Sequence, residues 1–206
     1  MSIRYIWKNY PVFTVLLVAL NGLLFLGPDL LGIPTSLDQV LLGGSVTLWD
    51  IENGAYYRVL TAMFLHFNIN HLMGNMLILA VLGYRLEHIL GHIPYLILYL
   101  VSGVGANMVT FLSYWLEGDY HVLSAGASGA IFGVCGGLFA VALIGREAEG
   151  ITSRQMLLLI LLTLFSGYLS AEVNNLAHLS GLLFGILLGT AFYLVKRRRS
   201  QRSLWM

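Results

Sequence analysis

Residues 174–195 read NNLAHLSGLLFGILLGTAFYLV, and this stretch decides the class of fold. Its apolar part is as long as the roughly 20 residues that an α-helix needs to cross a bilayer. Gly181, Gly185 and Gly189 recur at every fourth position, so they share one face of such a helix. Rows of small residues allow two membrane helices to approach closely. His178 stands on the same face, three residues before the first glycine. The stretch therefore predicts a tightly packed membrane helix that presents an ionisable side chain.

The composition of the whole chain agrees with this stretch. Hydrophobic residues make up 58% of its 206 residues and charged residues 10%, whereas a soluble domain has roughly 45–50% and about 25%. This excludes an ordinary cytosolic enzyme and a disordered tail. A net charge of +1 gives no broad basic field, which excludes a nucleic-acid binder. Cys135 is the only cysteine, so neither an intramolecular disulfide nor a cysteine zinc site can form.

Six apolar stretches have the length and composition of membrane spans. They comprise residues 12–31, 70–90, 95–116, 125–144, 155–170 and 176–195. We therefore expect an all-α membrane protein in which six transmembrane helices form one bundle, with a single domain over residues 1–206. The first stretch ends at Gly27, Pro28 and Asp29, which predict a helix stop, and it lacks the cleavage site of a signal peptide.

The positions of the basic residues predict which end of the bundle faces the cytoplasm. With the N-terminus inside, ten of the eleven Lys and Arg residues lie on the cytoplasmic side and only Arg58 lies outside. Both termini are then cytoplasmic, as a short segment 1–10 and a basic tail 196–206. The simplest interpretation of the tail is an anchor at the lipid headgroups, and a protein-binding tail is a less favoured alternative.

A long outer connection, residues 32–65, separates the first two predicted spans. Its apolar and amphipathic side chains suit a membrane interface better than water; they are Leu41, Leu42, Trp49, Tyr56 and Tyr57. Long ordered loops in compact proteins are usually functional. We therefore expect a structured, membrane-immersed loop between the first and second helices.

Polar side chains inside a membrane cost free energy, so a cluster of them in a span indicates function. One cluster enters the second span, where His71 and Asn75 are four residues apart and share a helix face. Both can donate hydrogen bonds towards one point. An N-cap role for Asn70 accounts for Asn68 and Asn70, but not for Asn75, which lies more than a turn deeper.

A second cluster surrounds Ser128 at the start of the fourth span. Gly126 and Gly129 leave its hydroxyl accessible, and the unpaired N–H groups at a helix start favour a developing anion. Taken alone, Gly129 and Gly133 are more typical of a G-x-x-x-G helix interface. With Gly137 they form a glycine row that has the same spacing as the row in the sixth span.

If the two glycine rows meet, Ser128 and His178 face each other near the outer ends of their helices. A serine and a histidine supply a nucleophile and its general base. Glu172 lies about two turns from His178 and no other carboxylate is near it, so we expect a dyad and not a triad. His71, Asn75 and the backbone N–H of Ser128 are then the candidate oxyanion donors.

Three motifs together resemble those of the rhomboid family of intramembrane serine proteases. They are H-x4-H-x3-N at His66, His71 and Asn75, then G-A-S-G at residues 126–129, then A-H-x2-G-x3-G at residues 177–185. Their order, in spans two, four and six, is that of the six-helix rhomboid core. Each motif is weak alone, but the combination is specific and extends over nearly the whole chain.

The resemblance implies a role for each matching residue. Ser128 would be the nucleophile, His178 the general base, and His71 and Asn75 the oxyanion donors. Supporting positions would be His66, Arg58, Phe132, Gly126, Gly129, Gly181 and Gly185. The chain departs from the family pattern at three positions: Phe132, where many relatives have tyrosine; Val173, where glycine is frequent; and Tyr57, where tryptophan is usual. None of these departures removes a reacting group, and the Phe132 ring can still stack on His178.

The implied reaction is hydrolysis of a peptide bond in or near a transmembrane segment, through an acyl-enzyme that water resolves. It needs no cofactor and no metal. The implied partners are transmembrane protein substrates and the lipid bilayer, with no nucleic acid, and the oligomeric state is left open. The implied location is the bacterial cytoplasmic membrane, where the chain would be a multi-pass protein.

Other functions fit the sequence less well. A rhomboid-like pseudoprotease would bind membrane clients without cleaving them, but its usual mark is loss of the serine or the histidine, and both are present. A small transporter would show internal repeats and a helix broken near mid-membrane, which the sequence does not display. A metalloprotease is excluded because H-E-x-x-H does not occur. His66 and His71 are poor zinc ligands because a step of five residues turns them apart on a helix.

Overall fold

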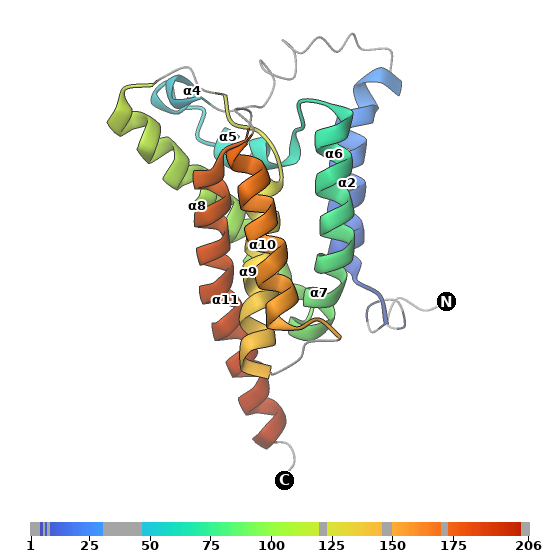
Figure 1. Cartoon of the computed structure of the whole chain (residues 1–206). Helices are drawn as coiled ribbons and strands as arrows, with labels where there is room; N and C mark the ends of the chain where they lie inside the picture. The colour runs from blue at the N-terminus through green and yellow to red at the C-terminus, as the bar shows by residue number, and fades with distance from the viewer. Residues whose placement is uncertain are drawn as a thin grey trace.

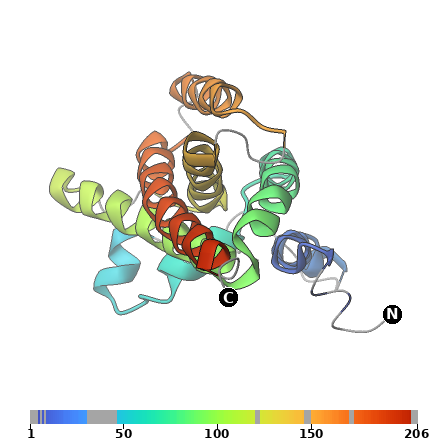
Figure 2. The ribbon, with the colours of Figure 1, turned by 90° about the horizontal axis from the view of Figure 1, so that it is seen from below.

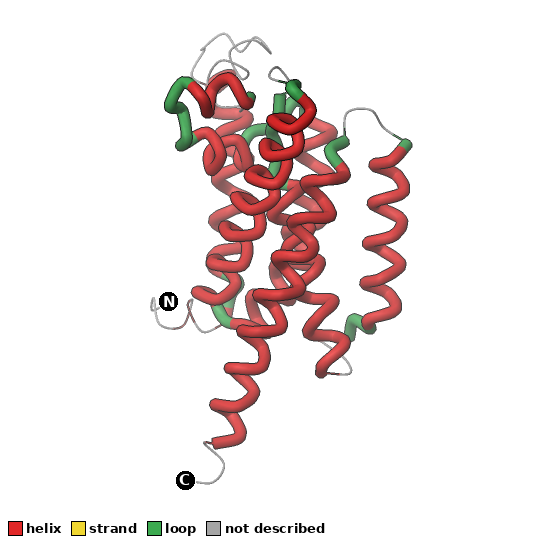
Figure 3. Tube along the Cα trace, turned by 90° about the vertical axis from the view of Figure 1, so that its left-hand side faces the viewer, coloured by secondary structure: helices red, strands yellow, loops and turns green. Residues whose placement is uncertain are grey.

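The computed structural model describes residues 5, 7, 9–30, 47–119, 123–145, 150–169 and 173–202. Within these residues the chain forms helices joined by loops, and no strand occurs among them (Figure 3). The prediction of an all-α protein is therefore confirmed. Residues 41 and 42 of the long outer connection, together with Glu172, lie outside the described residues.

The helices follow the predicted apolar stretches. Their bounds are α2 (Val12–Leu30), α4 (Leu48–Glu52), α5 (Arg58–Thr61), the 3-10 turn η1 (Ala62–Phe64), α6 (Ile69–Ile78), the π-helical turn η2 (Leu79–Gly83), α7 (Tyr84–Leu90), α8 (His92–Glu117), α9 (Ser128–Gly145), α10 (Ser153–Tyr168) and α11 (Asn175–Arg202). Each of the six predicted stretches thus corresponds to one helix, or to the consecutive helical segments α6, η2 and α7. The 3-10 turn η1 precedes α6 and is separated from it by residues 65–68, whereas the π-helical turn η2 continues α6 directly into α7.

Among the described residues, three helices, α8, α9 and α11, are long and apolar enough to cross a membrane. A fourth span is added if Arg58–Phe64 and Ile69–Leu90 count together, although the two segments are bent by 90° at the break between them. The apolar helices α2 and α10 are shorter. These helices are those of an integral membrane protein, and the count of six spans stays a prediction.

Two boundaries differ from the sequence interpretation. Helix α2 continues through Pro28 to Leu30 because a proline in the last turn removes one backbone hydrogen bond without ending the helix. The N-cap of α6 is Asn68 and not Asn70: the Asn68 side chain accepts a hydrogen bond of 2.8 Å from the backbone N–H of His71. The assignment of Asn70 as the cap was therefore wrong by two residues.

Helix α9 lies at the centre of the bundle. Viewed from below, α8, α10, α11 and the α6–α7 segment surround it, while α2 packs outside α7 (Figure 2). Buried side chains occur all round α9, which agrees with its uniformly apolar sequence. The first residue of α9, Ser128, is half-buried, and the helix that carries it has neighbours on every side.

The glycine rows of α9 and α11 meet, as the sequence pattern predicts. A methyl group placed on Gly181 would overlap the carbonyl oxygen of Gly129, and one on Gly185 would overlap that of Gly133. These obstacles are backbone atoms, which no change of side-chain rotamer can move. The two helices are thus in backbone contact, which is the packing that small residues allow in a membrane.

At the end of the bundle opposite to Ser128, a buried carboxylate binds the start of α2. Glu87 accepts hydrogen bonds from the backbone N–H of Phe13 (2.9 Å), from that of Thr14 (2.7 Å) and from the Thr14 hydroxyl (2.7 Å). The Nδ1 atom of His92 lies 2.5 Å from the same carboxylate. A carboxylate at a helix start satisfies N–H groups that have no partner within the helix. Glu87 therefore joins α2 to α7 and α8.

Candidate active site

The start of α9 is shaped by Gly126, two residues before Ser128. Its φ of +131° lies in a region that residues with a side chain rarely adopt. A Cβ atom at this position would also stand 2.8 Å from Cε1 of His71. Glycine therefore lets the chain turn into α9 while passing directly beside the His71 ring. Ser128 follows as the first residue of the helix.

The α6 side of the site supplies an imidazole and an amide. The Asn68 cap fixes the first turn of α6, which contains His71, and Asn75 follows one turn later. The His71 ring stacks on Phe67 at a centroid distance of 6.0 Å, and the buried ring of His66 meets it edge-on at 5.0 Å. His66 thus packs against the His71 ring without lining the cavity itself.

The α11 side supplies His178, which is 7% exposed. Its ring is stacked on that of Phe132 from α9, with the centroids 4.2 Å apart and the planes at 12°. The ring atom Nδ1 is buried and has no hydrogen-bond partner among the described residues. The orientation of the imidazole therefore rests on packing against Phe132.

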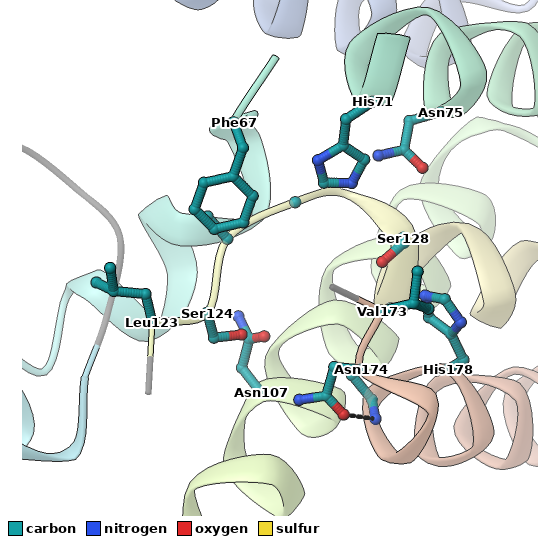
Figure 4. A pocket seen from close by; sticks show the side chains of 14 residues that line it. Phe67, His71, Asn75, Asn107, Leu123, Ser124, Ser128, Val173, Asn174 and His178 are labelled. Carbon is teal, nitrogen blue, oxygen red and sulfur yellow. Dashed lines mark hydrogen bonds between the residues drawn. The ribbon is translucent and has the colours of Figure 1, made fainter. Parts of the chain in front are cut away.

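These side chains line one cavity of about 170 Å³ between α6, α9 and α11 (Figure 4). His71 and Asn75 lie on one side of it, His178 lies on the opposite side, and Ser128 lies between them (Figure 4). Of the hydrogen bonds that the described residues make, none joins Ser128 to His178. Catalytic hydrogen bonds are often long in ligand-free enzymes and tighten when the substrate binds.

Asn75 has a donor that nothing in the described chain satisfies. Its Nδ2 atom is buried without a hydrogen-bond partner, and the residue is 8% exposed. Buried amide donors are normally paired because leaving one unpaired costs about 1–3 kcal/mol. Asn75 also lines the cavity, so its wall contains an unpaired amide donor near a hydroxyl and an imidazole, and groups of these types can stabilise a developing oxyanion.

The remaining predicted site residues lie outside the cavity wall, apart from Gly126 and Gly129, which line it. Arg58 is at the start of α5 and forms an ion pair of 3.0 Å with Asp50 of α4. It joins two short helices of the outer connection and does not reach the cavity. Gly181 and Gly185 do not line the cavity; they lie where α11 contacts α9.

Three polar residues of the cavity were given no role from the sequence: Asn107, Ser124 and Asn174. Asn107 lies within the third predicted span, and a polar residue in an apolar span is a signal of function that could have identified it. Ser124 and Asn174 precede helices, where polar residues are ordinary, so the sequence holds no comparable signal for them. No cluster of three or more His, Cys, Asp or Glu side chains able to hold a metal ion occurs in the described part of the chain.

Comparison with known proteins gives a family match and several relatives. The family model for the Rhomboid domain matches residues 53–195. Rhomboid protease GluP of Bacillus subtilis (strain 168) is 33% identical over 187 residues, which cover 90% of this chain and 36% of GluP. The rhomboid protein YdcA of the same strain is 34% identical over 200 residues, or 93% of this chain and 94% of YdcA. RHOMBOID-like protein 5 of Arabidopsis thaliana is 34% identical over 142 residues, or 68% of this chain and 45% of that protein. The chain therefore spans about a third of the length of GluP and nearly all of YdcA.

Proposed function

The chain belongs to the rhomboid family, and from this premise we propose that it is a serine protease that cleaves transmembrane proteins in or near their membrane-spanning segments. The proposal assigns Ser128 as the nucleophile and His178 as the general base. His71, Asn75 and the backbone N–H of Ser128 are assigned as oxyanion donors. The name of GluP as a rhomboid protease supports the reaction class.

The chemistry follows from these assignments. Ser128 Oγ attacks the carbonyl carbon of the scissile peptide while its proton passes to His178. The carbonyl oxygen becomes an oxyanion that accepts hydrogen bonds from the assigned donors. His178 then gives the proton to the leaving amine, the C–N bond breaks, and an acyl-enzyme remains. Water, activated by His178, attacks the ester and releases Ser128.

The observation that carries the proposal is the unpaired amide of Asn75 in the same cavity as Ser128 and His178. A buried donor without a partner has a physical explanation if its partner exists only during the reaction. A protein that only binds clients has no need for such a donor beside a serine and a histidine. This contrast favours the protease over the pseudoprotease.

The proposal includes a location and an orientation. Six spans would cross the bacterial cytoplasmic membrane, with both termini in the cytoplasm and the cavity near the outer face. Helix α2 begins, and α11 ends, at the end of the bundle opposite to the start of α9 (Figure 1). This arrangement supports cytoplasmic termini because the basic residues gather at the same end.

A fluorophosphonate probe tests the assignment of the nucleophile. We expect the purified wild type in detergent to be labelled, with a phosphorus–oxygen bond formed at Ser128 and fluoride released. Ser128→Ala and His178→Ala should not be labelled. Ser180→Ala is the matched control, because the Ser180 hydroxyl bonds only the carbonyl of Leu176 in its own helix. Labelling of Ser128→Ala at the wild-type rate would contradict the assignment, and a folded wild type that resists labelling would favour the pseudoprotease.

A further inference from the structure

Asn174 connects the start of α11 to α8. Its side-chain Oδ1 atom accepts a hydrogen bond of 2.9 Å from the backbone N–H of Ala177. Its backbone carbonyl oxygen accepts one of 3.2 Å from the backbone N–H of His178. The first of these bonds is the dashed line in Figure 4. Its Nδ2 atom donates to the Tyr114 hydroxyl at 3.0 Å and to the Thr110 hydroxyl at 3.4 Å. One side chain thus caps α11 and attaches it to a neighbouring helix.

The attachment points belong to a polar row on α8. Asn107, Thr110 and Tyr114 occur at intervals of three and four residues, so they share one face of α8. Asn107 donates a hydrogen bond of 2.8 Å to the carbonyl of Val59 in α5. Thr110 is fully buried. The polar face of α8 therefore holds the outer connection at one end and the start of α11 at the other.

The position of His178 depends on this attachment for two reasons. First, the contact between α9 and α11 is made by glycine backbone, and among the described residues no side-chain hydrogen bond joins the two helices, so the bonds of Asn174 to α8 are the polar attachment of the start of α11. Second, Nδ1 of His178 has no partner among the described residues, so the ring keeps its orientation only while it lies against Phe132. A displacement of the first turn of α11 would move the ring off Phe132.

We propose that Asn174 is a positioning residue, which acts through its bond to Tyr114 to hold His178 over Phe132 and beside Ser128. This inference rests on the proposed function for its kinetic consequences, although not for its structural ones. Asn174 touches neither reacting atom, and its effect is transmitted through one helical turn. A misplacement of about 1 Å at a reacting group can cost on the order of 100-fold in rate.

Four variants test the inference by kinetics on a transmembrane substrate in detergent. Asn174→Ala and Tyr114→Phe should each lower kcat about tenfold and leave KM within about twofold, since the substrate is still bound but the base is displaced. The double variant should be no slower than Asn174→Ala because both changes break the same contact. Asn174→Asp should have a kcat close to that of the wild type, because a carboxylate accepts hydrogen bonds from both the Ala177 N–H and the Tyr114 hydroxyl.

A second readout is independent of catalysis. The stack on Phe132 should shift the ring-proton NMR signals of His178 upfield in the wild type and in Asn174→Asp, and the shift should be lost in Asn174→Ala. Asn21→Ala is the matched control, since it removes an asparagine that is fully buried in α2, where its side chain donates to the carbonyl of Leu17. It should lower thermal stability and leave the His178 signals in place.

The outcomes separate this inference from the proposed function. A wild type that cleaves no substrate contradicts the proposed function, while the His178 signals still decide the role of Asn174. Unchanged His178 signals in Asn174→Ala overturn the inference, and so does a kcat within about twofold of an active wild type. Equal loss of the signals in Asn21→Ala also overturns it, because the effect would then be one of general destabilisation.

Discussion

The Phe132 ring on α9 stacks on the imidazole of His178 on α11, at a centroid distance of 4.2 Å and an interplanar angle of 12°. In a serine hydrolase with a triad, a carboxylate orients the histidine through Nδ1. Here Nδ1 of His178 has no partner among the described residues, and the ring packs against an aromatic side chain instead. The two helices that supply the rings are those whose glycine rows are in contact.

Replacing Phe132 with leucine removes the stack while preserving most of the buried volume. An aromatic pair contributes about 0.5–1.5 kcal/mol beyond its burial, so we expect kcat to fall up to about tenfold. Phe132→Tyr should keep the wild-type rate because the ring is retained. Phe139→Leu, on the same helix and also packed against the core, is the control and should cleave normally. Equal rates for Phe132→Leu and the wild type in a cleavage assay would show that the stack has no catalytic role.

Loss of an oxyanion donor should slow the chemical step. We expect His71→Ala and Asn75→Ala each to lower kcat by about 100- to 1000-fold with little change in KM, because the donors act on charge that exists only in the transition state. The measurement is steady-state cleavage of a transmembrane substrate. Asn53→Ala, which loses an exposed side chain that bonds the carbonyl of Trp49, should be unaffected. If both cavity variants cleave at the normal rate, the oxyanion is stabilised elsewhere.

A side chain in the glycine row should affect activity and stability together. Valine at position 181 would overlap the carbonyl oxygen of Gly129, so Gly181→Val must push α11 away from α9. We expect loss of fluorophosphonate labelling and a lower Tm in detergent. Gly22→Val in α2 is the matched control, since nothing lies within 4 Å of the position that its Cβ would take. A labelled, thermally stable Gly181→Val would contradict the close packing.

Removal of the buried carboxylate should destabilise the bundle far from the cavity. Glu87→Ala leaves the N–H groups of Phe13 and Thr14 without their acceptor. Hydrogen bonds to charged groups contribute about 1.5–3 kcal/mol each, so the loss of stability should be on the order of 3 kcal/mol. Thermal unfolding in detergent measures it, while the folded fraction at low temperature should still be labelled by the probe.

Glu117→Ala serves as the control for the carboxylate. Glu117 lies at the end of α8, where its exposed side chain accepts a hydrogen bond from Ser113. Its removal should change Tm little. A Tm for Glu87→Ala equal to that of the control would show that Glu87 does not hold α2 to the bundle.

Local patterns in the sequence were sufficient for the helices and for six of the fourteen residues that line the cavity. Hydropathy over about 20 residues reports whether a segment lies in lipid, so the positions of α8, α9 and α11 follow from the sequence. Spacings of three and four residues report which side chains share a helix face, and these spacings predicted that the glycine rows face each other. Errors occurred at helix ends, where Asn68 and Asn70 are equally good caps by type and the choice depends on the path of the preceding loop.

The sequence by itself determined that the chain is a helical membrane protein, and it predicted which serine, histidines and asparagine act together in a reaction. Only the tertiary structure decided that Asn174 bonds Tyr114, 60 residues earlier, and that Glu87 bonds Thr14, 73 residues earlier. The physical reason is that helix formation and membrane burial depend on neighbouring residues. Contacts between distant residues depend instead on how whole helices pack. Asn174 and Tyr114 occupy unremarkable positions in their own segments, and they become partners because the glycine rows bring α11 against α9 and, with it, against α8.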